Sequence, residues 1–211
     1  MKDTPRKKST GGILQLSRLE RFSDVVYALV LWEFFTLIPP LEGEKLDWAV
    51  VSTYFSDHIM SMVLVFLGVA VTIIYWLQNN AVLGNLESTD TRHTSLSIFQ
   101  LFCLMLFLLA MREGIDLGGS PVTRFFESLT AALMGWMSSF AYLHAIKKRR
   151  LLRDDVTDKD AKDLSFRIMA EPMAAMVTIP FIFTPTFWEI SWLSYLLIVP
   201  LLGRREVRKN A

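Results

Sequence analysis

One stretch decides how this chain folds: Arg18-Leu-Glu-Arg-Phe-Ser-Asp-Val-Val-Tyr-Ala-Leu-Val-Leu-Trp-Glu-Phe-Phe-Thr-Leu-Ile-Pro-Pro40. It begins with charged residues, becomes apolar at Val25 and stays apolar to Ile38 except for Glu33 and Thr36. A carboxylate near the middle of a membrane-length helix is costly, so it rarely persists without a partner, water or a task. The stretch therefore predicts a first membrane helix, over about 22–40, in which Glu33 has a specific role.

The composition of the whole chain is that of a membrane protein. Its 211 residues are 52% apolar and include 15 Phe and 6 Trp, whereas a soluble domain has about 45–50% apolar residues. The single cysteine, Cys103, excludes a disulfide within one chain. The first 24 residues are polar and basic, without the apolar core of a secretory signal, so we expect no signal peptide.

Apolar segments recur along the chain and predict an all-α integral membrane protein with six transmembrane helices per subunit. After the first span we expect the others at about 55–77, 94–112, 123–145, 167–185 and 187–202, with Pro172 and Pro180 interrupting the fifth. The predicted domains are a basic arm (1–20), a membrane domain (21–203) that contains a charged linker (146–166), and a basic tail (204–211).

The positive charges predict how the chain crosses the membrane. With six spans, 19 of the 22 Lys and Arg residues fall on one side, and Lys45, Arg112 and Arg124 on the other. Lys and Arg accumulate on the cytoplasmic side of membrane proteins. We therefore expect both termini in the cytoplasm and a multi-pass protein of a bacterial-type plasma membrane.

Four residues of the first helix share one face. At 100° per residue, Leu29, Trp32, Glu33 and Thr36 fall within a sector of about 100°. This face is typical of a pore wall in which Glu33 attracts cations and Leu29 forms a hydrophobic constriction that gates by dewetting. The alternative is a buried Glu33 that is hydrogen-bonded to a Trp indole or a hydroxyl, and the sequence leaves both interpretations open.

The charged start of the same helix holds a second candidate cluster. Arg18 and Asp24 could form a charge-assisted pair that joins helices, and Ser23, which follows Phe22, could cap a helix end. The alternative is that Arg18 and Asp24 are simple flanking charges at the membrane boundary.

The sequence contains no motif that points to catalysis. His58, His93 and His144 lack the spacing of metal ligands, and neither a nucleophile elbow nor a glycine-rich phosphate loop is present. We expect no enzyme, no metal site, no cofactor and no nucleic-acid partner.

The run Ser17 to Leu29 resembles the signature of the transmembrane protein 175 family of potassium channels. That signature has an Arg, three residues, Phe-Ser-Asp, three further residues, and then Ala and Ile or Leu. The residues that match in place are Arg18, Phe22, Ser23, Asp24, Ala28 and Leu29. Tyr75-Trp76 followed by Asn79-Asn80 is similar to the end of the family's second helix, and the six-span layout is similar too.

The resemblance implies a homotetramer whose first helices surround a central axis and form the constriction with apolar rings. It also implies that the Arg/Phe-Ser-Asp cluster packs the surrounding helices. By position, Leu29 occupies the innermost constriction site. Trp32 and Glu33 stand where Thr and an aliphatic residue are usual, and Thr36 stands where another aliphatic is common.

The sequence thus predicts a tetrameric cation channel in a lipid bilayer, with potassium as the permeant ion by resemblance. An alternative is a non-conducting membrane scaffold or partner-binding protein that retains the fold, which Trp32 favours because four indoles would crowd a narrow axis. A proton-coupled transporter that uses Glu33 is a third possibility, although transporters usually show paired repeats or broken helices.

Overall fold

The computed structural model describes residues 10–41, 47–117 and 119–194, and this part of the chain is almost entirely helical. No strand occurs within these ranges, apart from an isolated bridge between Leu86 and Leu152. The elements are α1 (Thr10–Thr36), α2 (Trp48–Gly84), α3 (Thr91–Asp116), α4 (Pro121–Lys147), η1 (Arg149–Leu151), α5 (Asp158–Thr178), η2 (Ile179–Phe181) and α6 (Pro185–Trp192). The all-α prediction is confirmed.

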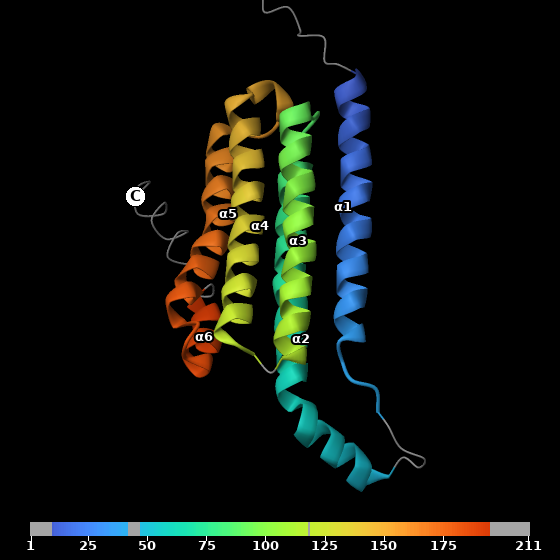
Figure 1. The fold of residues 1–211 in the computed structure, drawn as a ribbon. Coiled ribbons are helices and arrows are strands. Elements are labelled where there is room, and N and C mark those ends of the chain that lie inside the picture. Colours follow the sequence, from blue (N-terminus) through green and yellow to red (C-terminus); the bar gives the residue numbers. More distant parts are fainter. Residues whose placement is uncertain (1–9, 42–46, 118, 195–211) are drawn as a thin grey trace, which may run out of the picture.

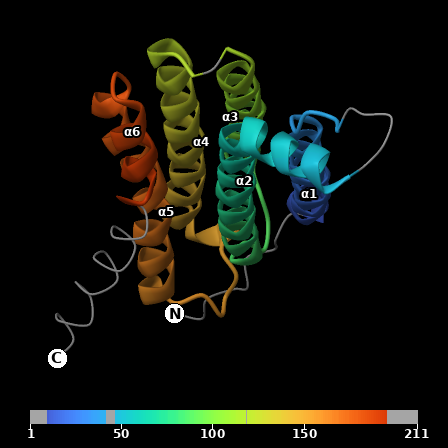
Figure 2. The same cartoon turned by 90° about the horizontal axis from the view of Figure 1, so that it is seen from below.

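The five long helices stand side by side as an up-and-down bundle with α1 at one edge (Figure 1). Viewed from below, α1 lies on one side, α2 and α3 form the middle, and α4, α5 and α6 lie on the other side (Figure 2). Helices α3 and α4 pack together most extensively, α5 packs on α4, and α1 contacts α2 and α3. Helix α1 therefore forms one edge of the bundle.

Within the described residues, three helices are long and apolar enough to cross a membrane: Ser61–Gly84 within α2, Thr91–Asp116 and Pro121–Lys147. The first part of α2, residues 48–60, leaves the bundle at an angle below α1 (Figure 1). These helices confirm a multi-pass membrane protein, and the count of six spans stays a prediction. The second half of the predicted sixth span, 195–202, lies outside the described residues, as does the tail.

The five long helices all begin before their predicted spans, and the difference is largest for α1 and α5. Helix α1 starts at Thr10 and so extends into the predicted arm. Helix α5 starts at Asp158, inside the predicted linker. Its start is a capping box, in which the Thr157 hydroxyl accepts from the Asp160 N–H at 3.1 Å and the Asp160 carboxylate accepts from the Thr157 N–H at 3.2 Å.

The predicted interruption at Pro172 is wrong, because α5 continues through this residue to Thr178. Pro172 packs closely against α4, where a side-chain carbon at Gly135 would come within 2.7 Å of its ring. The glycine therefore lets the two helices approach at the proline. The second predicted break is confirmed: Pro180 lies in η2, where α5 has ended.

Among the described residues, the interior consists of two clusters of buried side chains. The larger one lies along the bundle and includes Phe34 of α1, Val65 of α2 and Phe107 of α3. The smaller one lies at the end of the bundle where α1 begins, and it includes Leu19, Tyr142 and other residues of α1, α2, α4, α5 and the α4–α5 connection. Both clusters fix α1 against the rest of the chain.

Candidate functional site

The predicted pore-wall residues all lie on the exposed face of α1. Leu29 is 59% exposed and Trp32 67% exposed, and Glu33 and Thr36 are exposed as well. The structure therefore brings these four residues together on one surface that no other described part of the same chain covers. The strip covers about two turns of α1 and carries an apolar side chain, an indole, a carboxylate and a hydroxyl.

Glu33 is exposed within the single chain, so the alternative of a carboxylate buried inside the subunit does not hold there. Its side-chain partner is the Thr36 hydroxyl, which donates to the Glu33 carboxylate at 3.2 Å and to the Glu33 carbonyl at 2.7 Å. Both residues belong to α1. The carboxylate is thus held by its own helix and stays available on the surface.

The opposite face of α1 is anchored by buried side chains. The Tyr27 hydroxyl accepts from the Gln100 amide of α3 at 3.1 Å. The Phe34 ring packs at 60° to the Phe107 ring, with centroids 6.5 Å apart. Phe34 also rests on Gly68 of α2, where a side-chain carbon would come within 2.4 Å of the ring. These contacts fix the rotation of α1 about its axis and thereby the direction of its exposed face.

One residue of the predicted signature cluster, Asp24, joins α1 to α2. Asp24 accepts a hydrogen bond from the Trp76 indole at 3.1 Å, and among the described residues no ion pair joins Asp24 to Arg18. The prediction that Ser23 caps a helix end is wrong, because α1 begins at Thr10 and Ser23 lies well inside it. Ser23 is buried, whereas Arg18 and Phe22 are exposed. Sequence reasoning missed the role of Trp76 because 52 residues separate it from Asp24.

Two further carboxylates lie inside the bundle, and sequence reasoning missed both. Glu127 of α4 and Glu171 of α5 are each only 4% exposed. Glu127 packs against the backbone of α3 at Gly114, where a side-chain carbon would clash with its carboxylate. The same signal that singled out Glu33, an acid within an otherwise apolar run, could have identified them.

Polar contacts tie the start of α1 to the connections at the same end of the bundle. The Gly12 carbonyl accepts from the Thr89 N–H at 3.2 Å. Next to Thr89, the Asp90 carboxylate caps α3 by accepting from the His93 N–H at 3.0 Å, and His144 of α4 approaches it to 3.0 Å. Burial opposes ionisation of Asp90, but the hydrogen bonds from His93 and His144 outweigh it and lower the pKa of Asp90.

This architecture occurs in a solved structure of a channel. A variant of the potassium channel MtTMEM175, crystallised with a nanobody-MBP fusion protein, matches 99% of this chain and 100% of its own chain with a TM-score of 0.61. This chain has a TMEM175-like fold. The sequence identity is 18%, so the likeness establishes the fold alone.

No protein-family model matches the sequence, and no curated protein matches it either. The TMEM175-like fold agrees with the resemblance that the Arg18 to Leu29 signature indicates. The matching structure is that of an ion channel and not of an enzyme. Together with the three apolar helices, it identifies the chain as a multi-pass membrane protein with a channel fold.

Proposed function

We propose that this chain is one subunit of a homotetrameric cation channel that conducts potassium, with α1 lining a central pore. One observation carries the proposal: in a chain with a channel fold, α1 borders the bundle and exposes Leu29, Trp32, Glu33 and Thr36 on one strip. A symmetric assembly around that strip would turn it inward and cover it.

The chemistry of the strip suits a water-filled path better than lipid. A carboxylate within the membrane needs water or a partner, and one turn of helix away Thr36 supplies a hydroxyl to Glu33. Four copies of Glu33 would form a ring of negative charge that attracts cations and disfavours anions. Four copies of Leu29, about one turn earlier, would form an apolar ring that can exclude water and close the path.

The orientation follows from the basic residues. Both termini lie in the cytoplasm and the protein resides in a bacterial-type plasma membrane, because 19 of the 22 Lys and Arg residues then lie on the cytoplasmic side. In this orientation Leu29 is nearer the cytoplasm than Glu33. Potassium is the permeant ion, and conduction uses no cofactor.

Ion flux into liposomes that contain the purified protein tests the proposal, with sodium and choline in place of potassium as controls. We expect Leu29→Ala to raise the leak, because smaller side chains widen and hydrate the constriction. Leu143→Ala is the matched control, since Leu143 is an exposed leucine of α4. Equal flux for wild type, Leu29→Ala and Leu143→Ala would contradict a gate at Leu29.

Glu33→Gln tests the charge and keeps the shape of the side chain. We expect the preference for cations over anions to fall, because the ring of carboxylates would become neutral. Bilayer recordings of the reversal potential in a potassium chloride gradient measure this preference. Unchanged selectivity and unchanged conductance would show that Glu33 does not face the path.

One observation favours a second function, that of a non-conducting membrane scaffold. Trp32 is 67% exposed on the same strip, and four indoles would crowd a narrow axis. If the scaffold interpretation is correct, the intact oligomer conducts no ions, and Trp32→Ala does not restore flux. Ion flux through the wild-type protein would exclude the scaffold function.

A further inference from the structure

Five exposed basic residues gather where α4 ends and the α4–α5 connection begins: Lys147, Lys148, Arg149, Arg150 and Arg153. Two of them are held by acidic residues of the same connection. The Arg153 guanidinium donates to both carboxylate oxygens of Asp155, at 2.9 and 3.1 Å. Arg149 approaches the Asp158 carboxylate to 3.7 Å and donates to the Val156 carbonyl. The charges of Arg149 and Arg153 are thus compensated within the chain.

The other three residues, Lys147, Lys148 and Arg150, form no ion pair with any residue that the structure describes. Exposed positive charges without a partner attract anions. Lys147 is also the last residue of a helix that is long and apolar enough to cross a membrane. The three charges therefore lie at the level where such a helix reaches the lipid headgroups.

An exposed apolar surface continues along α4 from these three basic residues. At 100° per residue, Phe140, Leu143 and Lys147 fall within a sector of about 60°. Phe140 is 46% exposed and Leu143 42% exposed. About one turn before Phe140, the Trp136 ring stacks on the Phe140 ring with centroids 5.8 Å apart. This face of α4 thus joins a cationic end to apolar side chains, which is the complement of an anionic amphiphile.

We propose that this face of α4 binds an anionic phospholipid, with the headgroup phosphate at Lys147, Lys148 and Arg150 and an acyl chain along Leu143 and Phe140. Lys and Arg residues at a membrane surface attract anionic lipids. The apolar side chains favour a lipid over a soluble anion, because only a lipid has a chain to place against them. Helix α4 lies on the side of the bundle away from α1 (Figure 2), so the site does not depend on which helix lines a pore.

A fluorophore beside the basic residues measures which lipid gathers there. Leu143→Cys is labelled with bimane in the full-length protein, since the natural Cys103 is buried. Phosphatidylcholine bilayers then receive equal fractions of phosphatidylglycerol or phosphatidylcholine with brominated chains, which quench bimane. We expect brominated phosphatidylglycerol to quench at least three-fold more efficiently. Phe126→Cys, at an exposed position near the other end of α4, is the control label and should be quenched equally by both lipids.

Two double variants, measured with the Leu143 label, separate a headgroup site from a general attraction to positive charge. Each lowers the net charge by two. Lys147→Gln with Arg150→Gln removes unpaired charges and should abolish the preference for phosphatidylglycerol. Arg149→Gln with Arg153→Gln removes paired charges and should leave the preference nearly unchanged. If the second double variant does not fold, the single variants Lys147→Gln and Arg153→Gln make the same comparison at two exposed positions.

Three results would overturn the proposal. The first is equal quenching of the Leu143 label by both brominated lipids, or the same preference at the Phe126 label. The second is an equal loss of preference in both double variants, because net charge alone would then explain the attraction. The third is displacement of brominated phosphatidylglycerol by millimolar inorganic phosphate, which would assign the three basic residues to a soluble anion. None of these measurements requires the protein to conduct ions.

Discussion

Replacing Gly68 by alanine tests whether a single close contact sets the rotation of α1. A side-chain carbon at Gly68 would lie 2.4 Å from one carbon and 2.7 Å from another of the Phe34 ring. Phe34 is fully buried and its ring packs against that of Phe107, so displacing the ring would disturb this packing. Gly68→Ala should therefore force apart α1 and α2 or displace the ring, and overpacking of this kind costs about 1–3 kcal/mol.

The helix preference of alanine acts in the opposite direction and reduces the loss of stability that overpacking at Gly68 causes. Alanine favours a helix over glycine by about 0.5–1 kcal/mol. Gly84 supplies the control, because it lies on the same helix and a side-chain carbon there meets nothing within 4 Å. Gly84→Ala should be neutral or slightly stabilising, and Gly68→Ala should be less stable than Gly84→Ala by about 1–3 kcal/mol.

Thermal unfolding in one detergent measures the difference. For a chain of this size about 1 kcal/mol corresponds to about 2–4 °C in Tm, so the two variants should differ by about 2–12 °C. Phe34→Leu, which shortens the ring, should reduce the penalty of Gly68→Ala, with a coupling of about 0.5–3 kcal/mol in the double-mutant cycle. Equal Tm values for Gly68→Ala and Gly84→Ala, or no coupling to Phe34, would refute the reasoning.

Two further predictions concern polar contacts, one between α1 and α2 and one at the start of α3. Trp76→Phe keeps an aromatic ring but removes the donor to Asp24, so thermal unfolding should show a loss of about 0.5–1.5 kcal/mol; an unchanged Tm would mean that the bond contributes nothing. At the other polar junction, the lowered pKa of Asp90 means that its ionised form stabilises the fold above the usual carboxyl range. This stabilisation is lost as the pH falls from the usual carboxyl range through the lowered pKa. Asp90→Asn should therefore make the free energy of unfolding depend less on pH in the acidic range. An identical pH dependence in both proteins would contradict this.

Local periodicity was enough to predict much of the fold. The spacing of apolar residues placed Leu29 and Glu33 on one face of a helix, and the structure finds that face exposed and the opposite face buried. The predicted spans 94–112 and 123–145 lie within α3 and α4, because long apolar runs and turn residues determine such helices locally. The sequence predicts helical pieces in the charged linker but does not locate the start of α5 there, although Thr157 and Asp160 form a capping box.

What could not be predicted depends on residues that are distant in the sequence. Ser23 was expected to cap a helix end, but α1 begins thirteen residues earlier, at Thr10, and continues past it. The partner of Asp24 is Trp76 on another helix, and the fit of Phe34 on Gly68 is visible only once α1 and α2 are packed. Neither contact leaves a periodic pattern in the sequence, because each depends on the relative rotation of two helices.

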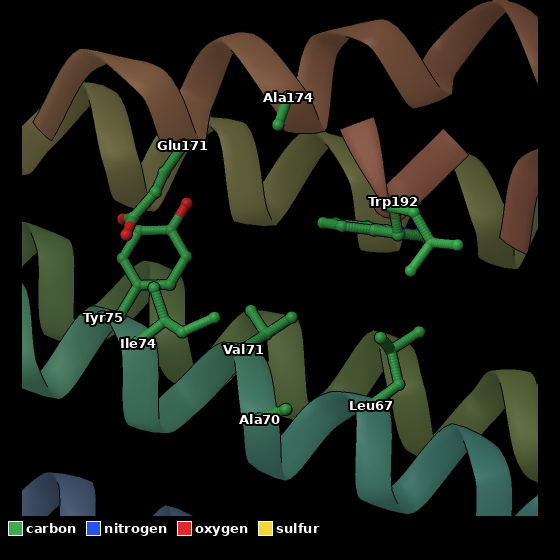
Figure 3. A pocket seen from close by; sticks show the side chains of 9 residues that line it. Leu67, Ala70, Val71, Ile74, Tyr75, Glu171, Ala174 and Trp192 are labelled. Carbon is green, nitrogen blue, oxygen red and sulfur yellow. The ribbon is translucent and has the colours of Figure 1, made fainter. Parts of the chain in front are cut away.

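Glu33, Glu127 and Glu171 show how the same cost of a carboxylate in an apolar run can lead to different roles. Each of these carboxylates is costly in a membrane unless a partner or water compensates it. The surroundings of each carboxylate determine which kind of compensation is available. Glu127 lies against the α3 backbone at Gly114, and Glu171 lies at the Tyr75 end of a cavity between α2 and α5 (Figure 3). Both are buried inside one subunit, so neutralising either should change the stability of the isolated chain.

Glu33 differs because its own chain leaves it exposed. Glu33→Gln should therefore leave the thermal stability of the dissociated subunit unchanged within about 0.5 kcal/mol and act only on the assembled protein. Measuring both the unfolding of the subunit and the ion selectivity of the oligomer separates an effect on folding from an effect on the assembled pore. A large loss of subunit stability would place Glu33 with the buried carboxylates and remove the main argument for a pore along α1.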